Sequence, residues 1–234
     1  MKNCQGQKLG RKGKDTRDRI VEAARQLIVE ARVHPMSLSA VARHASIGMS
    51  SIYTYFKDMT ELVLAVLEPV GELSESAYIR MIRDRWPDDQ LDKRAREFVH
   101  GFHGFWEENS RLLHLRNQMA DQQDLRMIAH RIQMAQPVMT LLARQMDASP
   151  HGPPGMEQDL ASVLFTGLER VVTMATDAYL KSSFPVNIRS RYEGGAIEQQ
   201  GRVLALAILA ALIFLTPLLT RGQEAYAGPP RGAK

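Results

Sequence analysis

The sequence predicts an all-α protein. Of its 234 residues, 44% are hydrophobic and only 6% are aromatic, so the chain can bury a sizeable core. Apolar residues recur at helical spacing along most of the chain, and the alternation of β-branched residues that is typical of strands is nearly absent. Glycine and proline concentrate in a few short stretches that separate the helical segments. The length is enough for two domains.

The first predicted helix begins at Asp15 or Thr16, either of which can cap it, and Pro35 ends the linker that follows. Two shorter helices are then predicted within residues 37–62, separated by a tight turn at residues 46–48. Small and bulky apolar residues alternate so that these helices can pack closely into a miniature core. The residues of that core are Val41, Ala42, Ala45, Ile47, Ile52 and Phe56.

The second short helix leaves a polar face that carries hydroxyls, phenols and one lysine, with no acid before Asp58. Such a face suits phosphate oxygens and base edges in a major groove, and it favours a DNA-binding element. The alternative is an ordinary amphipathic pair in which the tyrosines are half-buried core. The predicted DNA-binding residues of this region are Ser37, Ser39, Ser50, Ser51, Tyr53, Thr54, Tyr55 and Lys57.

The basic charge of the chain lies at the same end. Residues 1–58 have a net charge of +6, whereas the rest has −2. Arg11, Lys12 and Lys14 are predicted to add salt-dependent DNA affinity from a basic flexible tail over residues 1–13. A solvated tail without that role is the alternative.

Three consecutive motifs can be recognised over roughly residues 14–66: TRDRIVEAARQLI, SLSAVARHASIG and SSIYTYFKDMTEL. In this order and at this spacing they resemble the amino-terminal domain of TetR/AcrR-type transcriptional regulators. The resemblance implies a homodimeric repressor that binds double-stranded DNA at a palindromic operator and is released by a small molecule. The chain departs from the family pattern at Ser46 and Gly48 in the turn. It also has Met59 where the family has a lysine, which puts one phosphate contact in doubt.

After residue 57, the sequence predicts a series of amphipathic helices. Asp58 with Glu61 is close to a capping box that opens a fourth helix, which Pro69 and Gly71 could kink. Later helices are predicted at residues 88–108, 111–119, 125–146, 157–182 and 196–221, with loops at 147–155 and 182–195. The expected domains are a helix-turn-helix DNA-binding domain at 14–62, a helical effector-binding and dimerisation domain at 63–221, and a flexible tail at 222–234.

Residues 203–220 carry no charge, which leaves two interpretations of the last helix. A membrane span needs about 20 apolar residues, and Pro217 interrupts this shorter stretch. We therefore expect no membrane contact but a helix buried between the core and a partner subunit. By resemblance to the family, residues 157–182 and 196–221 form the homodimer interface.

Aromatic residues and methionines recur along the middle helices. They can be plain core, but methionine also adapts to variable ligand shapes, and the family resemblance implies a cavity for an effector. The composition predicts an apolar or aromatic ligand. The predicted ligand-binding residues are Phe98, Phe102, Trp106, Met119, Met127, Met134, Phe165 and Met174.

Other functions lack the residues they need. Neither a phosphate-binding glycine loop nor a nucleophile motif is present, so we expect no enzyme and no cofactor. The scattered histidines, among them His100 and His103, predict no metal site, and the lone Cys4 fits a reducing cytoplasm. Two alternatives stay open: an effector-independent DNA-binding protein and a membrane-tethered interaction protein.

Overall fold

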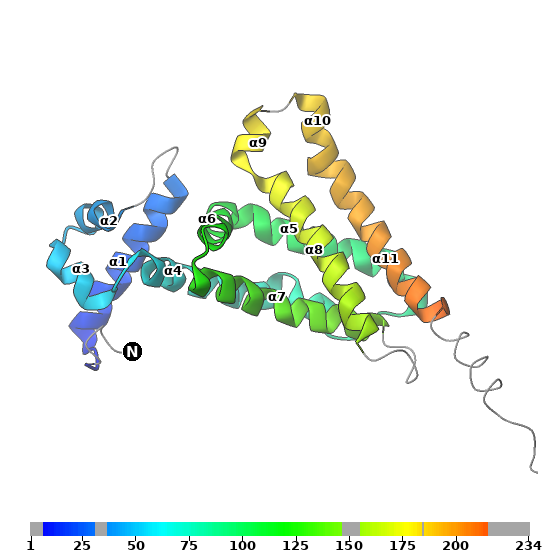
Figure 1. Cartoon of the computed structure of the whole chain (residues 1–234), viewed down its shortest axis with the longest axis horizontal. Coiled ribbons are helices and arrows are strands. Elements are labelled where there is room, and N and C mark those ends of the chain that lie inside the picture. The colour runs from blue at the N-terminus through cyan, green and yellow to red at the C-terminus, as the bar shows by residue number, and fades with distance from the viewer. Residues whose placement is uncertain (1–6, 31–36, 147–154, 184, 215–234) are drawn as a thin grey trace, which may run out of the picture. The chain divides into compact units, whose positions relative to one another are not determined.

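The computed structural model describes residues 7–30, 37–146, 155–183 and 185–214, and these residues form helices with no strand among them (Figure 1). The predicted all-α class is confirmed. The elements are α1 (Arg11–Glu30), α2 (Leu38–His44), α3 (Met49–Tyr55), α4 (Met59–Ala77), η1 (Ile79–Ile82), η2 (Asp88–Gln90), α5 (Leu91–Glu108), α6 (Ser110–Asp121), α7 (Leu125–Met146), α8 (Met156–Thr176), α9 (Ala178–Ser183), α10 (Val186–Ser190), η3 (Arg191–Gly195) and α11 (Ala196–Phe214).

The chain divides into two compact units, and each unit is built from two segments. The first unit comprises residues 1–75 and 109–134, and the second comprises residues 76–108 and 135–234. This division differs from the expected single boundary after residue 62. The first unit recruits the later segment because α6 packs against α1 and because Thr60 of α4 bonds to Asp124 before α7.

The core of the first unit follows the predicted pattern. Of the six predicted residues of the miniature core, five are buried, whereas Ile47 in the turn is only half-buried. The small alanines among them let α1 and α2 approach closely. The buried residues include Ile20, Ala23, Ala24, Ile28, Val41, Ala42, Ala45, Ile52, Phe56, Leu62, Val63 and Val66.

The first helix begins earlier than expected. It starts at Arg11 instead of at Asp15 or Thr16, and the hydroxyl of Thr16 donates to the carbonyl of Lys12 inside the helix at 2.9 Å. Thr16 is therefore an interior helical residue and not a cap. Residues 11–13, which were expected to belong to the flexible basic tail, are thus helical, and the spacing of Arg11, Lys12 and Lys14 is set by the helical repeat.

The second unit is held by an aromatic core and by a close helix contact. Phe102 of α5 packs edge-on against Tyr78 and against Phe165 of α8, with ring centroids 4.9 and 5.6 Å apart. Helices α5 and α11 meet at Gly201, where a Cβ atom would lie 2.6 Å from Cγ of Arg96. The glycine is thus what permits this approach.

Three predicted helices of the middle region are confirmed, with ends that differ by at most three residues. The predicted helix at 157–182 is instead divided, because Asp177 has an extended backbone and its carboxylate accepts from the N–H groups of Tyr179 and Leu180 to begin α9. The predicted loop at 182–195 is largely helical. Pro185 precedes α10, where a missing N–H costs no helical bond.

The last helix, α11, is described as far as Phe214, so the predicted end at residue 221 and the tail at 222–234 lie outside the described residues. Within the part of the chain that the structure describes, none of the helices combines the length and the apolarity needed to cross a membrane.

Candidate nucleic-acid interface

The turn between α2 and α3 has the geometry of a helix-turn-helix. Ser37 caps α2, since its Oγ accepts from the N–H of Ala40 at 3.2 Å. The chain then reverses at Ser46, which has a left-handed backbone with φ of 54°, and the N–H of Ile47 donates to the carbonyl of Ala42 at 3.0 Å. Gly48 opens α3 without a side-chain cap, as the sequence implied.

Helix α3 presents two different faces. Ile52 is fully buried, and Phe56 just after the helix is buried as well, so this side belongs to the core. Ser50 and Thr54 each lie two positions from Ile52, which is about 200° around the helix, and therefore face away from that core. The hydroxyl of Thr54 donates to the carbonyl of Ser50 at 3.2 Å, so its oxygen can still accept a hydrogen bond.

Cations and phenols flank this outward face. Tyr53 is half-exposed and Lys57 is exposed, whereas Ser51 and Tyr55 are only partly accessible. On α1, the side chains of Arg11, Lys12 and Lys14 are exposed. Ser37, the cap of α2, and Ser39 in its first turn are exposed, and their hydroxyls lie 3.0 Å apart. All eleven predicted DNA-binding residues thus belong to the first unit.

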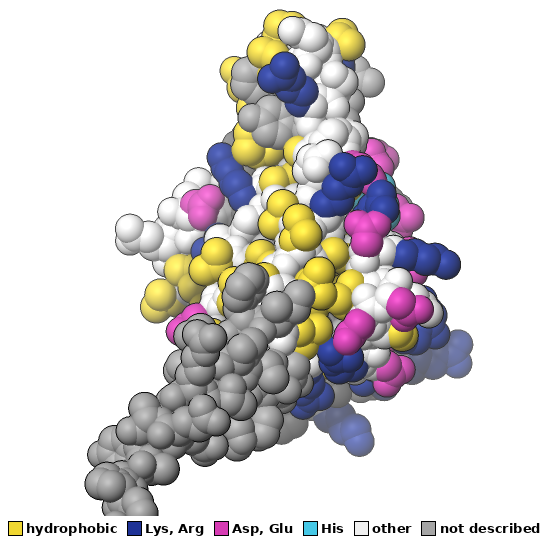
Figure 2. All heavy atoms as spheres, turned by 90° about the vertical axis from the view of Figure 1, so that its right-hand side faces the viewer, with side chains coloured by type: hydrophobic (Ala, Val, Ile, Leu, Met, Phe, Trp, Pro, Cys, Tyr) yellow, Lys and Arg dark blue, Asp and Glu magenta, His cyan; other side chains and the backbone are white. Residues whose placement is uncertain are grey.

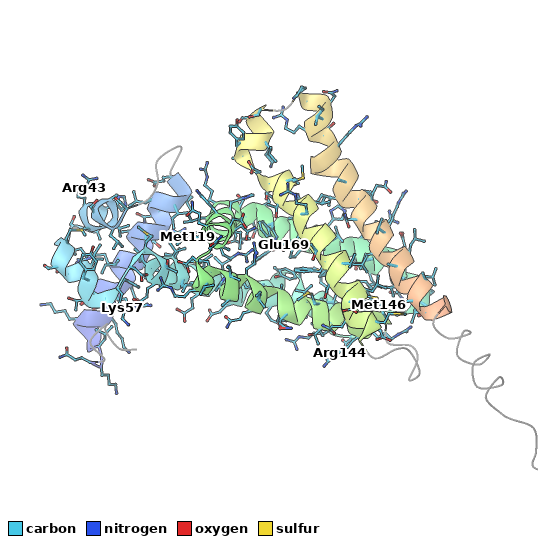
Figure 3. All side chains as sticks on the ribbon, in the orientation of Figure 1. Arg43, Lys57, Met119, Arg144, Met146 and Glu169 are labelled. Atoms are coloured by element: carbon cyan, nitrogen blue, oxygen red, sulfur yellow. The ribbon has the colours of Figure 1, made fainter. Side chains whose placement is uncertain are left out.

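Two further basic residues of this unit were not singled out from the sequence. Arg43, in the last turn of α2, is exposed beside the turn that leads to α3 (Figure 3). Arg17 of α1 lies with its guanidinium carbon 5.2 Å from the ring centre of Phe56, a cation–π contact that ties α1 to the end of α3. A basic residue in the last turn of the first short helix was the available signal for Arg43.

Comparison with known proteins identifies this domain. Residues 20–66 match the family model of bacterial regulatory proteins of the tetR family. These residues are a TetR-family helix-turn-helix domain. They span the described residues from the middle of α1 to the middle of α4, and they include the whole outward face of α3.

Solved structures of TetR-family regulators share the fold of most of the chain at low identity. One from Mesorhizobium loti MAFF303099 matches with a TM-score of 0.57 and 18% identity, covering 86% of this chain and 98% of that chain. One from Marinobacter aquaeolei VT8 matches with a TM-score of 0.55 and 16% identity, covering 85% of this chain and 98% of that chain. One from Rhodococcus sp. RHA1 matches with a TM-score of 0.54 and 18% identity, covering 88% of this chain and 98% of that chain. Among curated protein sequences, none matches significantly. The chain combines the domain and the fold of a TetR-family transcriptional regulator.

The TetR-type domain departs from its family pattern where the sequence indicated. Met59 stands in the lysine position and is half-buried in the first turn of α4. A thioether cannot donate a hydrogen bond, so this residue makes no charged phosphate contact. Lys57, two residues earlier, is exposed and lies directly after α3 (Figure 3).

The predicted effector-binding residues are divided between the two units. Met119, Met127 and Met134 belong to the first unit, where Met127 is fully buried and the other two are half-buried. The second unit holds the other five. There the aromatic side chains are buried against one another, and Met174 is half-buried. Their role in ligand binding stays a prediction. The five residues of the second unit are Phe98, Phe102, Trp106, Phe165 and Met174.

Three histidines of the middle helices lie in different surroundings. His100 lies 3.3 Å from Glu198 of α11, and burial lowers the pKa of His103. Burial and the charge of Arg116 also lower the pKa of His130. In the described ranges, no group of three or more histidine, cysteine or acidic side chains is close enough together to hold a metal ion.

Proposed function

We propose that this protein is a homodimeric TetR-type repressor that binds a palindromic operator and leaves it when a small apolar or aromatic molecule binds. The observation that carries the proposal is the outward face of α3. It presents Ser50, Thr54 and Tyr53 beside exposed cations, and residues 31–57 contain no acidic side chain that would repel phosphate.

Each residue has a role that its chemistry supports. Hydroxyls on the outward face of a helix can donate to or accept from base edges in the major groove, and the methyl of Thr54 can contact a thymine methyl. The phenols and cations around that face bind phosphate oxygens, which fixes the register but reads no sequence. We assign Ser50, Ser51 and Thr54 to base edges; Ser37, Ser39, Tyr53, Tyr55 and Lys57 to phosphates; and Arg11, Lys12 and Lys14 to additional salt-dependent affinity.

The proposed dimer is supported by an unusually apolar exposed surface on the second unit. Val203 and Leu206 of α11 are 48% and 64% exposed, and Val163 of α8 is 69% exposed. Figure 2 shows hydrophobic side chains gathered along the middle of the face that α11 presents, with charged side chains mainly at its margins. A second copy that packs there would bury this surface, as expected for an isologous interface formed by residues 157–182 and 196–221.

Release by a ligand requires only a modest difference in affinity between two arrangements of the dimer. A difference of about 1–3 kcal/mol changes operator binding roughly 5- to 150-fold. The expected apolar or aromatic character of the effector rests on residue type, since the predicted ligand-binding residues are aromatics and methionines. Titration of such compounds into the operator complex, with DNA release measured by fluorescence anisotropy, tests this step. An effector-independent protein would release DNA with none of them.

The central test is selection of bound sequences from random duplex DNA at near-physiological salt. We expect an enriched palindrome with half-sites about ten base pairs, or a small multiple, apart. If no sequence were enriched and binding were weak and strongly salt-dependent, the protein would bind DNA only non-specifically, through its basic amino-terminal region.

Replacing Thr54 with valine is expected to weaken binding to the selected operator. The change preserves the shape of the side chain but removes its hydroxyl, which should cost about 1–3 kcal/mol, or roughly 5- to 150-fold in Kd. The matched control is Thr173→Val on α8, where the hydroxyl also donates to the carbonyl four residues earlier and the side chain is also half-buried. Because Thr173 lies within the proposed dimer interface, sedimentation equilibrium must show that this variant is as dimeric as the wild type. Equal affinities for the two variants would remove Thr54 from the base-reading set.

Replacing Leu206 with arginine is expected to convert the dimer into monomers. A charge within the apolar surface cannot be buried without a partner, so the variant should have the 26.3 kDa mass of a single chain by sedimentation equilibrium, and the wild type twice that mass. Leu73→Arg on α4, where the leucine is 53% exposed, serves as the control and should remain dimeric. A dimeric Leu206→Arg protein would place the interface elsewhere.

A further inference from the structure

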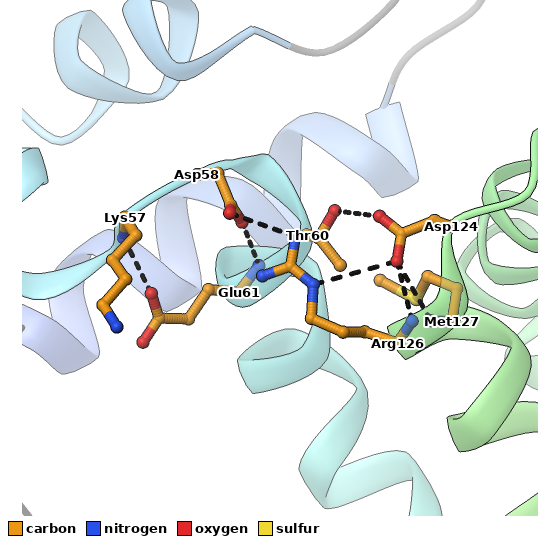
Figure 4. Close-up of polar contacts among 7 residues, drawn as sticks. All are labelled: Lys57, Asp58, Thr60, Glu61, Asp124, Arg126 and Met127. Carbon is orange, nitrogen blue, oxygen red and sulfur yellow. Dashed lines mark hydrogen bonds and ion pairs between the residues drawn. The ribbon is translucent and has the colours of Figure 1, made fainter.

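The amino ends of α4 and α7 are joined by polar side chains, although their residues are more than sixty positions apart in the chain. The hydroxyl of Thr60 donates to a carboxylate oxygen of Asp124 at 2.5 Å. Arg126 lies 3.0 Å from the carboxylate of Asp58 and 3.8 Å from that of Asp124 (Figure 4). We call these four residues the clasp.

Each carboxylate of the clasp has two tasks. Asp58 caps α4, because its Oδ1 accepts from the N–H of Glu61 at 2.9 Å while its other oxygen pairs with Arg126. Asp124 caps α7 in the same way by accepting from the N–H groups of Arg126 and Met127. The two helix ends are therefore fixed by the same groups that join them.

Both carboxyls are ionised at neutral pH. Partial burial raises the pKa of Asp58, but the N–H of Glu61 and the guanidinium of Arg126 outweigh it and hold the pKa below its ordinary value. The hydrogen bond from Thr60 is the largest cause that lowers the pKa of Asp124. The clasp is thus a set of charge-assisted bonds, which are stronger than neutral ones.

The connection from the clasp to α3 is short and held at both sides. Only residues 56–58 separate α3 from α4. Phe56 is buried, and the backbone N–H of Lys57 donates to a carboxylate oxygen of Glu61 at 2.7 Å (Figure 4). With the turn fixed in this way, the position of the first turn of α4 also fixes the carboxyl end of α3.

We infer that the clasp sets the orientation of the recognition helix α3, so that Thr60, Asp124 and Arg126 are positioning residues for operator binding. None of them belongs to the DNA-contacting face. This inference rests on the proposed function, because it assigns to residues 124–126 a control over the same DNA site. Side chains that contact bases must be placed to within about half an ångström, whereas the fold of the domain tolerates larger shifts of a helix.

A structural role and a positioning role predict different results. The side chain of Arg126 is 49% exposed, and ion pairs at this exposure contribute little to overall stability. Loss of the pair should then leave the melting temperature nearly unchanged. If the pair positions α3, operator affinity nevertheless falls, and its salt dependence stays the same because no phosphate contact is lost.

The test compares Arg126→Gln, Thr60→Val and their combination in the full-length protein. We expect operator affinity to fall roughly 5-fold or more in the combined variant, with an unchanged salt slope. Arg126→Lys should restore part of the affinity of Arg126→Gln. The control is Arg131→Gln, which removes a pair on the same helix, to Asp121 at 3.4 Å, that does not reach α3 or α4. Unchanged affinity, or a slope reduced by about one unit, would overturn the inference.

A measurement without DNA separates this inference from the proposed function. Amide hydrogen exchange of the free combined variant should accelerate at residues 52–61, while α1 and α2 keep their wild-type rates. Unaltered exchange at 52–61 would show that the clasp does not hold α3, whatever DNA the protein binds. If the wild type selected no operator, the proposed function would fail instead, and the assignment of a role in operator binding would fail with it.

Discussion

Phe102→Ala is expected to lower the free energy of unfolding by about 3–5 kcal/mol, which corresponds to a fall in melting temperature of roughly 6–20 °C. Phe102 is 2% exposed and lies at the centre of the aromatic core, where Phe98, Trp106 and Phe165 all contact its ring. Removal of the ring loses its burial and leaves a cavity that packed helices cannot close completely. Urea unfolding followed by circular dichroism measures the change.

The control for this variant is Tyr179→Ala, which removes an aromatic ring that is 76% exposed on α9. That change should leave the unfolding free energy within about 0.5 kcal/mol of the wild type. If Phe102→Ala cost as little as the control, Phe102 would not be part of the core. Its predicted place in an adaptable effector site would then become the better interpretation.

Gln145→Leu is expected to cost at least about 3 kcal/mol, since a buried polar group without a partner costs roughly 1–3 kcal/mol. The amide of Gln145, which is 1% exposed, makes three bonds to the segment before α5. Its oxygen accepts from the N–H of Trp86 at 2.8 Å, and its nitrogen donates to the carbonyls of Ile82 and Asp84 at 3.0 and 2.9 Å. Leucine fills a similar volume but leaves all three backbone groups unpaired.

Thermal and urea unfolding measure this loss, and Gln133→Leu on the exposed side of α7 provides the matched control. The control should be close to neutral because the solvent continues to hydrate that position. Should Gln145→Leu prove as stable as the control, the segment at residues 82–86 would have to satisfy its backbone groups by another arrangement.

Local signals in the sequence were sufficient for most of the helices. Ser37 and the Asp58 to Glu61 pair were identified as caps, and both accept the backbone bonds that caps require. The apolar spacing also gave the buried side of α3 and hence its outward face. The errors in the helix boundaries arose at residues whose type is compatible with both a helix and a break. Asp177 starts a new helix within an apolar repeat, and proline and glycine at 185–195 accompany helical turns where they predicted a loop.

Contacts between residues far apart in the chain could not be predicted from such local signals. Nothing local to Asp124 or Arg126 indicates that they bond to Thr60 and Asp58, because that pairing exists only after α6 and α7 fold against the amino-terminal helices. The same holds for Tyr78 and Trp86, which complete the aromatic core from outside the helix that carries Phe98. The predicted effector residues shared a residue type rather than a location, and the structure divides them between the units.

The discontinuity of the first unit limits how its amino-terminal domain can be recombined with other chains. A fragment cut after residue 75 would carry Asp58 and Thr60 but leave their partners behind with residues 109–134. Moving this unit intact into another protein would therefore mean grafting two separate stretches of sequence. Substitutions at the start of α7 are then constrained by the bonds that these residues make to α4, and not only by the packing of α7 itself.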